Sequence, residues 1–233
     1  MNRDTYRINR RTLIAGASAT GLFALLPSAA NAQGLGKLGL SSILGKATDS
    51  ALDKLAKPGA FYDDKDVRIG LPIVGKSSGG LLGGLLNAGN RLGILDGLTR
   101  NINDAAGVAA GEAKPIFRDA IDNLSFSDAP GIIREDDGGT QYLRQSSNDA
   151  LHTKLEPLVD SALEKVGVYE QFDGLAEKHS FIRAAGLNRE SINRSVTDQG
   201  LDGIFSYVGS EERTFRKNPL KNLGGALGDI LGS

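Results

Sequence analysis

Apolar side chains recur at intervals of three and four residues through much of this 233-residue chain, which is the spacing of one face of a helix. Residues 40–56, 96–123, 142–166 and 196–216 carry this pattern, and leucine, isoleucine and alanine supply most of the apolar face. The strict alternation that indicates a strand never extends beyond a few residues. We therefore predict an all-α fold, with a single bundle-like domain over residues 40–233.

Glycine and proline indicate where these helices end. Lys57-Pro58-Gly59 follows the first helix, and Gly167 follows the third. Pro115 lies inside the second pattern, where it either kinks the helix or starts a new segment, because proline lacks the backbone donor. We expect the Asp136–Gly139 stretch to form a further break.

Several segments are expected to be less regular. The Gly/Leu-rich N-terminal region includes residues 33–39, which should form a loose lead, and glycines among the leucines of residues 79–95 weaken a helical pattern there. Residues 59–72 should form an ordered crossing loop with a short extended piece. Residues 189–195 should form a polar connection, and residues 220–231 a small amphipathic tail.

The first 32 residues have the three parts of an export signal. A basic stretch contains the adjacent Arg10 and Arg11, an apolar stretch follows, and Ala30-Asn31-Ala32 provides a small-residue cleavage site. The arginine pair resembles a twin-arginine translocation signal, with ordinary secretion as the alternative. The apolar stretch is shorter than the roughly 20 residues of a permanent transmembrane helix. We expect cleavage after Ala32 and a periplasmic or otherwise exported protein.

Composition excludes several classes of function. The chain has no cysteine and only two histidines, His152 and His179, so we expect no disulfide, no metal site and no cofactor. Without residues 1–32 it has 23 basic and 27 acidic residues, a formal net charge of −4. A chain with no basic excess is poorly suited to binding nucleic acid.

Several short motifs follow one another along the chain in an order and spacing typical of one family. They are Gly59–Asp63, Val67–Pro72, Pro115–Ile121, Ser127–Ala129, Thr140–Arg144, Leu201–Phe205, Glu211-Glu212 and Arg216–Pro219. Together they resemble the bacterial domain of unknown function 4197, whose members are helical and generally exported, and the resemblance implies no activity, cofactor or catalytic residue. Gly70 and Gly138-Gly139 depart from the family's usual residues and suggest looser packing.

The densest polar cluster of the sequence contains Glu211, Glu212, Arg216 and Asn218. Glu212 and Arg216 are four residues apart on one helical face and can pair, which is a structural interpretation of the cluster. Its functional interpretation is a polar patch that binds a ligand or a partner.

A second group of acidic residues contains Asp119, Asp122 and Asp128, which could gather near one helix end. Paired carboxylates can perform acid–base chemistry where burial separates their pKa values. Asp128 fits equally well in the first turn of a short helix that Ser127 would cap.

The sequence contains no recognisable catalytic set, which favours a non-enzymatic binding or interaction module of the cell envelope. Its partner would be an apolar ligand, a lipid or a protein. The alternative is an envelope hydrolase that uses the acidic residues around Asp119, Asp128, Glu211 and Glu212. The sequence sets no oligomeric state.

Overall fold

The computed structural model describes residues 29–71, 93, 95–125, 135–184 and 188–217. Within these ranges the chain is helical and contains no strand, which confirms the all-α prediction. The helices are α1 (Ala29–Leu55), α2 (Ala60–Asp63), α4 (Asp96–Glu112), α5 (Lys114–Asp122), α7 (Gly138–Lys165), α8 (Val168–Lys178), α9 (Ser180–Ala184) and α10 (Arg189–Lys217).

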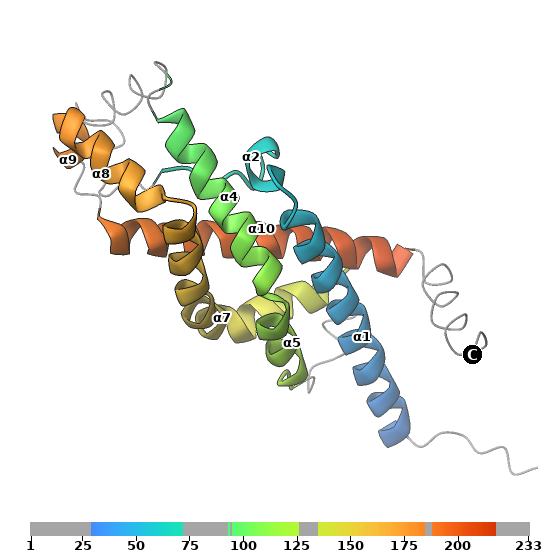
Figure 1. The fold of residues 1–233 in the computed structure, drawn as a ribbon. Helices are drawn as coiled ribbons and strands as arrows, with labels where there is room; N and C mark the ends of the chain where they lie inside the picture. Colours follow the sequence, from blue (N-terminus) through green and yellow to red (C-terminus); the bar gives the residue numbers. More distant parts are fainter. Residues whose placement is uncertain (1–28, 72–92, 94, 126–134, 185–187, 218–233) are drawn as a thin grey trace, which may run out of the picture.

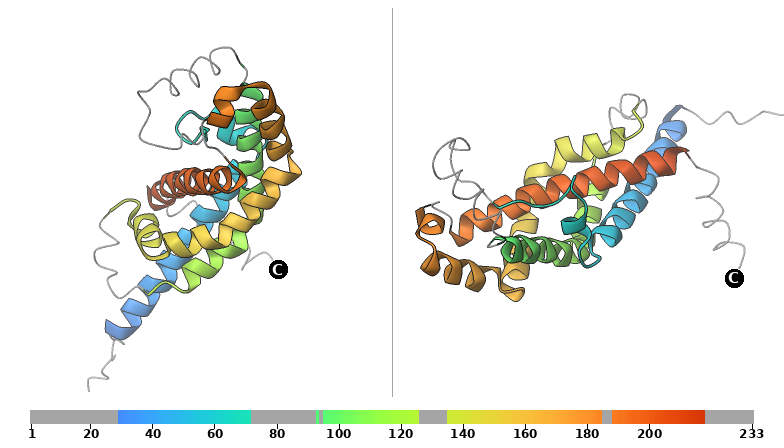
Figure 2. Two further views of the ribbon diagram at one scale, coloured as in Figure 1. Left: turned by 90° about the vertical axis from the view of Figure 1, so that its left-hand side faces the viewer. Right: turned by 90° about the horizontal axis from the view of Figure 1, so that it is seen from above.

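The long helix α10 is central to the arrangement, because it packs against both α1 and α7 (Figure 1). Helix α4 packs against α7 and α2, and α5 packs against α1 and α7. Helices α8 and α9 lie at the end of the bundle where α10 begins (Figure 2). Helix α10 therefore joins parts of the bundle that are far apart in sequence.

Aliphatic side chains make up most of the core, as the sequence predicts. Leu44 and Leu52 of α1, Ile102 of α4 and Leu163 of α7 are completely buried, and burial of such a side chain contributes roughly 1.5–3 kcal/mol. The exceptions include two phenylalanines, Phe117 and Phe205, whose rings meet edge to face with centroids 6.1 Å apart.

Two predicted helix boundaries are confirmed. The helical pattern of residues 96–123 divides at Ala113, and Pro115 occupies the first turn of α5, where a missing N–H removes no helical hydrogen bond. Helix α7 ends before Gly167, whose φ of 79° lies in the left-handed region that favours glycine.

Other local expectations are wrong in whole or in part. Residues 33–39 belong to α1, and residues 60–63 form α2. The expected break is present as a turn at Asp136 and Asp137, but α7 already begins at Gly138. Residues 189–195 are the start of α10, because Asn188 caps it: Ser191 N donates to Asn188 Oδ1 at 2.8 Å, and Asn188 N donates to Ser191 Oγ at 2.9 Å. The expectations for residues 79–92, 127–133 and 220–231 lie outside the described residues.

The segment after α2, for which an extended piece is predicted at residues 67–69, forms a turn at residues 65–67. Its next residues lie between α4 and α10, where two side-chain amides hold them. Asn103 of α4 accepts a hydrogen bond from Ile69 N at 2.8 Å and donates to Ile69 O at 2.9 Å. Gln199 of α10 does the same at Gly70, at 2.9 and 3.1 Å. The backbone at Gly70 is therefore held from outside, so the expectation of looseness there is wrong.

Candidate functional site

The buried carboxylate of Glu212 reaches from α10 to the beginning of α7. Its side chain is fully buried, and Gly139 N donates to Oε1 at 3.0 Å. Thr140 donates twice to Oε2, from its backbone N and from its hydroxyl, each at 2.7 Å. The first N–H groups of a helix lack helical acceptors and carry partial positive charge. The Glu212 carboxylate accepts hydrogen bonds from two of these groups in α7, and its negative charge interacts favourably with the helix dipole.

Gly139 makes this contact possible. A Cβ at this position would lie 2.7 Å from Glu212 Oε1, closer than Cβ atoms come to other heavy atoms in proteins. Gly138 and Gly139 are both buried. The expectation that these two glycines loosen the structure is therefore wrong, because Gly139 instead permits a close interhelical contact.

The predicted pair of Glu212 and Arg216 is confirmed. Arg216 donates to Glu212 Oε1 from Nε at 2.9 Å and from Nη2 at 2.6 Å. The side chain of Arg216 is 16% exposed, so the positive charge lies close to the buried negative one. This proximity offsets the cost of removing the carboxylate from water, which is large for an unpaired charge.

A polar groove of about 250 Å³ lies beside this contact, between the first turns of α7 and the middle of α10. Two ion pairs join the helices across it: Arg144 with Asp202, and Arg213 with Asp137. The groove, called the α7–α10 groove below, is lined by Asp137, Thr140, Gln141, Arg144, Asp202, Phe205, Ser206, Gly209 and Arg213.

The arginine side chains of the α7–α10 groove differ in their surroundings. The guanidinium of Arg144 lies over the Phe205 ring, 5.4 Å from its centroid. Asp137, the partner of Arg213, also accepts a hydrogen bond from Gln141 Nε2 at 2.6 Å. The groove therefore presents charges of both signs, and chemically it can bind a charged or hydrogen-bonding group.

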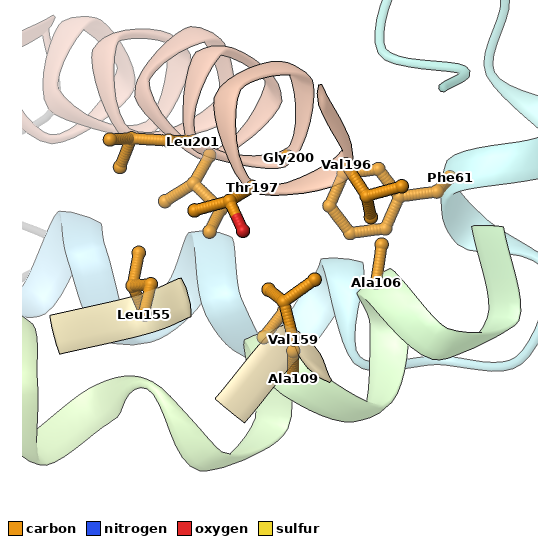
Figure 3. A pocket seen from close by; sticks show the side chains of 11 residues that line it. Phe61, Ala106, Ala109, Leu155, Val159, Val196, Thr197, Gly200 and Leu201 are labelled. Carbon is orange, nitrogen blue, oxygen red and sulfur yellow. The ribbon is translucent and has the colours of Figure 1, made fainter. Parts of the chain in front are cut away.

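The core also contains a small apolar cavity among α2, α4, α7 and α10 (Figure 3). Its volume is about 20 Å³, which is the order of a single water molecule. Phe61, Leu155, Val159 and Leu201 are among the side chains that line it. This cavity is too small for a lipid or another apolar ligand.

The other acidic candidates are engaged at different places on the bundle. Lys154 lies 2.5 Å from Asp119 and holds the pKa of that carboxyl below its ordinary value, by a hydrogen bond and by its charge. Glu211 accepts a hydrogen bond from Ser50 at 2.7 Å and pairs with Lys54, both on α1. This arrangement gives no support to the hydrolase alternative.

Two of the candidate residues, Asp128 and Asn218, lie outside the described ranges. Among the residues described, no group of three or more His, Cys, Asp or Glu side chains could hold a metal ion. His152 of α7 instead faces Asp198 of α10, with 3.0 Å between Nε2 and Oδ1. Over the same residues, no helix has the length and apolar character needed to cross a membrane.

Comparison with known families identifies a relationship over nearly the whole chain. The family described as "Protein of unknown function (DUF4197)" matches residues 32–232. The chain belongs to the DUF4197 family. No curated protein and no solved structure matches it.

The groove residues of this DUF4197 protein were not singled out as candidates from the sequence. Arg144 and Asp202 nevertheless belong to two of the motifs that carry the family resemblance, Thr140–Arg144 and Leu201–Phe205. The structure brings these motifs together across the groove, where Arg144 pairs with Asp202 and lies over Phe205. The sequence does not reveal that these two motifs lie side by side on the surface, and so it gives no signal for the groove.

Proposed function

We propose that this DUF4197 protein is an exported, non-enzymatic interaction module that binds a protein partner at the α7–α10 groove. The observation that carries the proposal is the groove itself, which is polar, open to solvent and built from two rigid helices. Sites on helices hold their side chains more precisely than sites on loops.

A surface partner is favoured over an enclosed ligand. The apolar cavity of about 20 Å³ leaves no room for a lipid chain between α2, α4, α7 and α10. The groove of about 250 Å³ is below the usual range of roughly 300–1,000 Å³ for small-molecule sites. It suits the side chain of a larger partner, with the surrounding helices supplying further contact.

Native mass spectrometry of the protein purified from its own envelope fraction tests this function. After mild cross-linking in cells with a cleavable reagent, we expect a complex that separates into polypeptide masses alone once the cross-link is cleaved. A reproducible small mass released from the single chain would instead favour a carrier of a small ligand, and would contradict the proposal.

Export is a separate part of the proposal. It is supported by the arginine pair, the apolar stretch and the small-residue site at Ala30 and Ala32, and by a family match that begins at residue 32. The twin-arginine route predicts that Arg10→Lys with Arg11→Lys retains the chain in the cytoplasm with its leader uncleaved. Unchanged cleavage and export of that variant would indicate ordinary secretion, and a wild-type chain retained in the cytoplasm would overturn export.

A further inference from the structure

The two arginines of the α7–α10 groove indicate the chemistry of its ligand. A guanidinium presents parallel N–H donors that match a carboxylate, and in this groove each guanidinium already binds a carboxylate of the chain. We propose that the groove binds an acidic side chain of the partner, and that the incoming carboxylate replaces Asp202 on Arg144. This inference rests on the proposed function and specifies its ligand.

Arg144 is the better exchange site of the two. Asp202 is 62% exposed, whereas Asp137 on Arg213 is 25% exposed and is also held by Gln141. An ion pair between exposed side chains contributes little stability, so Asp202 can turn into solvent at small cost. Displacement of Asp137 would break its bonds to both Arg213 and Gln141. We therefore expect the pair of Arg213 and Asp137 to remain intact when the ligand binds at Arg144.

Arg144 also remains in position when Asp202 leaves. Its guanidinium lies over the face of Phe205, and that ring is buried and packed edge to face on Phe117. This aromatic support orients the guanidinium independently of its ion pair. Binding therefore requires little reorganisation of the arginine, which reduces the cost of ordering the site.

The charges of the groove favour a carboxylate over a phosphate group. Either anion would face Asp137 and the displaced Asp202 on the same surface. A carboxylate brings one negative charge to this surface, whereas a phosphate group brings close to two at neutral pH. Repulsion from the two aspartates therefore disfavours the phosphate group more than the carboxylate.

The test uses the full chain with nitrogen-15 in its arginines, so that each Nε–Hε group gives an NMR signal. The probe is the acidic dipeptide N-acetyl-Glu-Glu-amide, and its matched control is N-acetyl-Gln-Gln-amide at equal ionic strength. Arg118 is the internal control, because it is 59% exposed and paired with Asp49 away from the groove. The variants are Arg144→Gln and Asp202→Asn.

We expect a saturable shift of the Arg144 and Arg213 signals with the acidic probe alone. Asp202→Asn should tighten binding about two- to fivefold, because the internal competitor is gone. Arg144→Gln should weaken it about tenfold or more. An equal response to the glutamine probe, an identical titration of Arg118, or weaker binding by Asp202→Asn would overturn the inference.

Failure of this inference differs from failure of the proposed function. A cross-linker placed in the groove captures a partner whatever its charge. A captured partner without any response of Arg144 to the acidic probe would leave the groove as the binding surface and exclude the carboxylate. The absence of a captured partner would count against the proposed function itself.

Discussion

The carboxylate of Glu212 lies so close to Gly139 that any larger residue at position 139 would clash with it. The carboxylate oxygen Oε1 accepts a hydrogen bond from Gly139 N at 3.0 Å, at the point where a Cβ would lie 2.7 Å away. The contact joins helices whose residues are 73 positions apart. It fixes the beginning of α7, which also forms one wall of the proposed binding groove.

Replacement of Glu212 by Ala should strongly destabilise the fold. The change leaves the N–H groups of Gly139 and Thr140 without their acceptor and removes the ion pair between Glu212 and the mostly buried Arg216. Loss of one member of a buried ion pair costs about 3–5 kcal/mol. Urea denaturation monitored by circular dichroism measures the change.

Asp119→Ala is the matched control, because the ion pair of Asp119 with Lys154 is about half exposed on both sides. Its unfolding midpoint should remain close to that of the wild type. Equal unfolding midpoints for Glu212→Ala and the wild type would refute the structural role of the buried carboxylate.

Gly139→Ala should also lower stability, although alanine is ordinarily the better helix former. The new methyl group forces Glu212 away from at least one of its bonds, and such overpacking costs about 1–3 kcal/mol. Gly174→Ala in α8 provides the comparison, since its new Cβ would meet nothing within 4 Å. This variant should be more stable than the wild type by up to about 1 kcal/mol. The thermal unfolding temperature should therefore fall for Gly139→Ala and rise for Gly174→Ala; a rise for both variants would contradict the close contact.

Asn103→Ala should release the segment after α2 at Ile69. The variant loses bonds to both backbone groups of Ile69, in a site where Asn103 is 2% exposed, at a cost of about 1–3 kcal/mol. Hydrogen exchange at the Ile69 amide should accelerate. Gln199→Ala, at the exposed Gly70 contact, should accelerate the Gly70 amide with less effect on overall stability. Unchanged protection of Ile69 in Asn103→Ala would contradict the assigned bonds.

Thr48→Val should stabilise the protein. Thr48 is completely buried in α1, and its hydroxyl has no hydrogen-bond partner among the residues described. Removal of an unsatisfied buried hydroxyl at equal volume relieves about 1–3 kcal/mol. Thr197→Val removes a hydroxyl that bonds Asn193 Oδ1 at 3.2 Å, and should destabilise instead. A loss of stability in Thr48→Val would indicate a partner for its hydroxyl.

The pair of Tyr207 and Asp64 should make stability depend on pH at both extremes. The hydrogen bond from Tyr207 to Asp64, 2.7 Å long, raises the pKa of Tyr207 to about 12 and lowers the pKa of Asp64. Folding then favours neutral Tyr207 and ionised Asp64. The tyrosine contribution is complete below the unfolded value near pH 10 and is lost as pH rises through 12; the aspartate contribution is lost as pH falls below about 4.

Tyr207→Phe measures this linkage. The difference in unfolding free energy between wild type and variant should be constant at intermediate pH. It should become smaller at the acid end and at the alkaline end of the pH range. A difference that stays constant both below pH 4 and between pH 10 and pH 12 would contradict the hydrogen bond. Absorbance of tyrosinate should also show one fewer phenol that titrates near pH 12.

Features set by neighbouring residues could be predicted from the sequence. The start of α5 at Pro115, the end of α7 before Gly167 and the pair of Glu212 with Arg216 all depend on residues within one or two helical turns. The start of α10 was also local, but the reciprocal bonds of Asn188 and Ser191 were hidden by the polar composition of residues 189–195. Ile192 in the first turn of α10 is also fully buried, which adds to the stability of this helix start.

The candidate site depends on contacts that helical periodicity cannot provide. Spacing places Glu212 and Arg216 on one face, but it does not reveal that this face meets the first turn of α7. The same holds for the pairing of Arg144 with Asp202, which are 58 positions apart. From the sequence, the Gly138-Gly139 pair predicts a helix break. Its close contact with another helix is visible only once the packing of α10 against α7 is known.

Site-specific cross-linking in cells tests the binding role of the α7–α10 groove most directly. A photo-reactive residue at Ser206, which is exposed in the groove, should capture a defined protein partner, and the same residue at the exposed Asp173 of α8 should not. Arg144→Gln should reduce the capture from Ser206, while Arg118→Gln should leave it unchanged. Equal capture from both positions, or none from Ser206, would contradict the account.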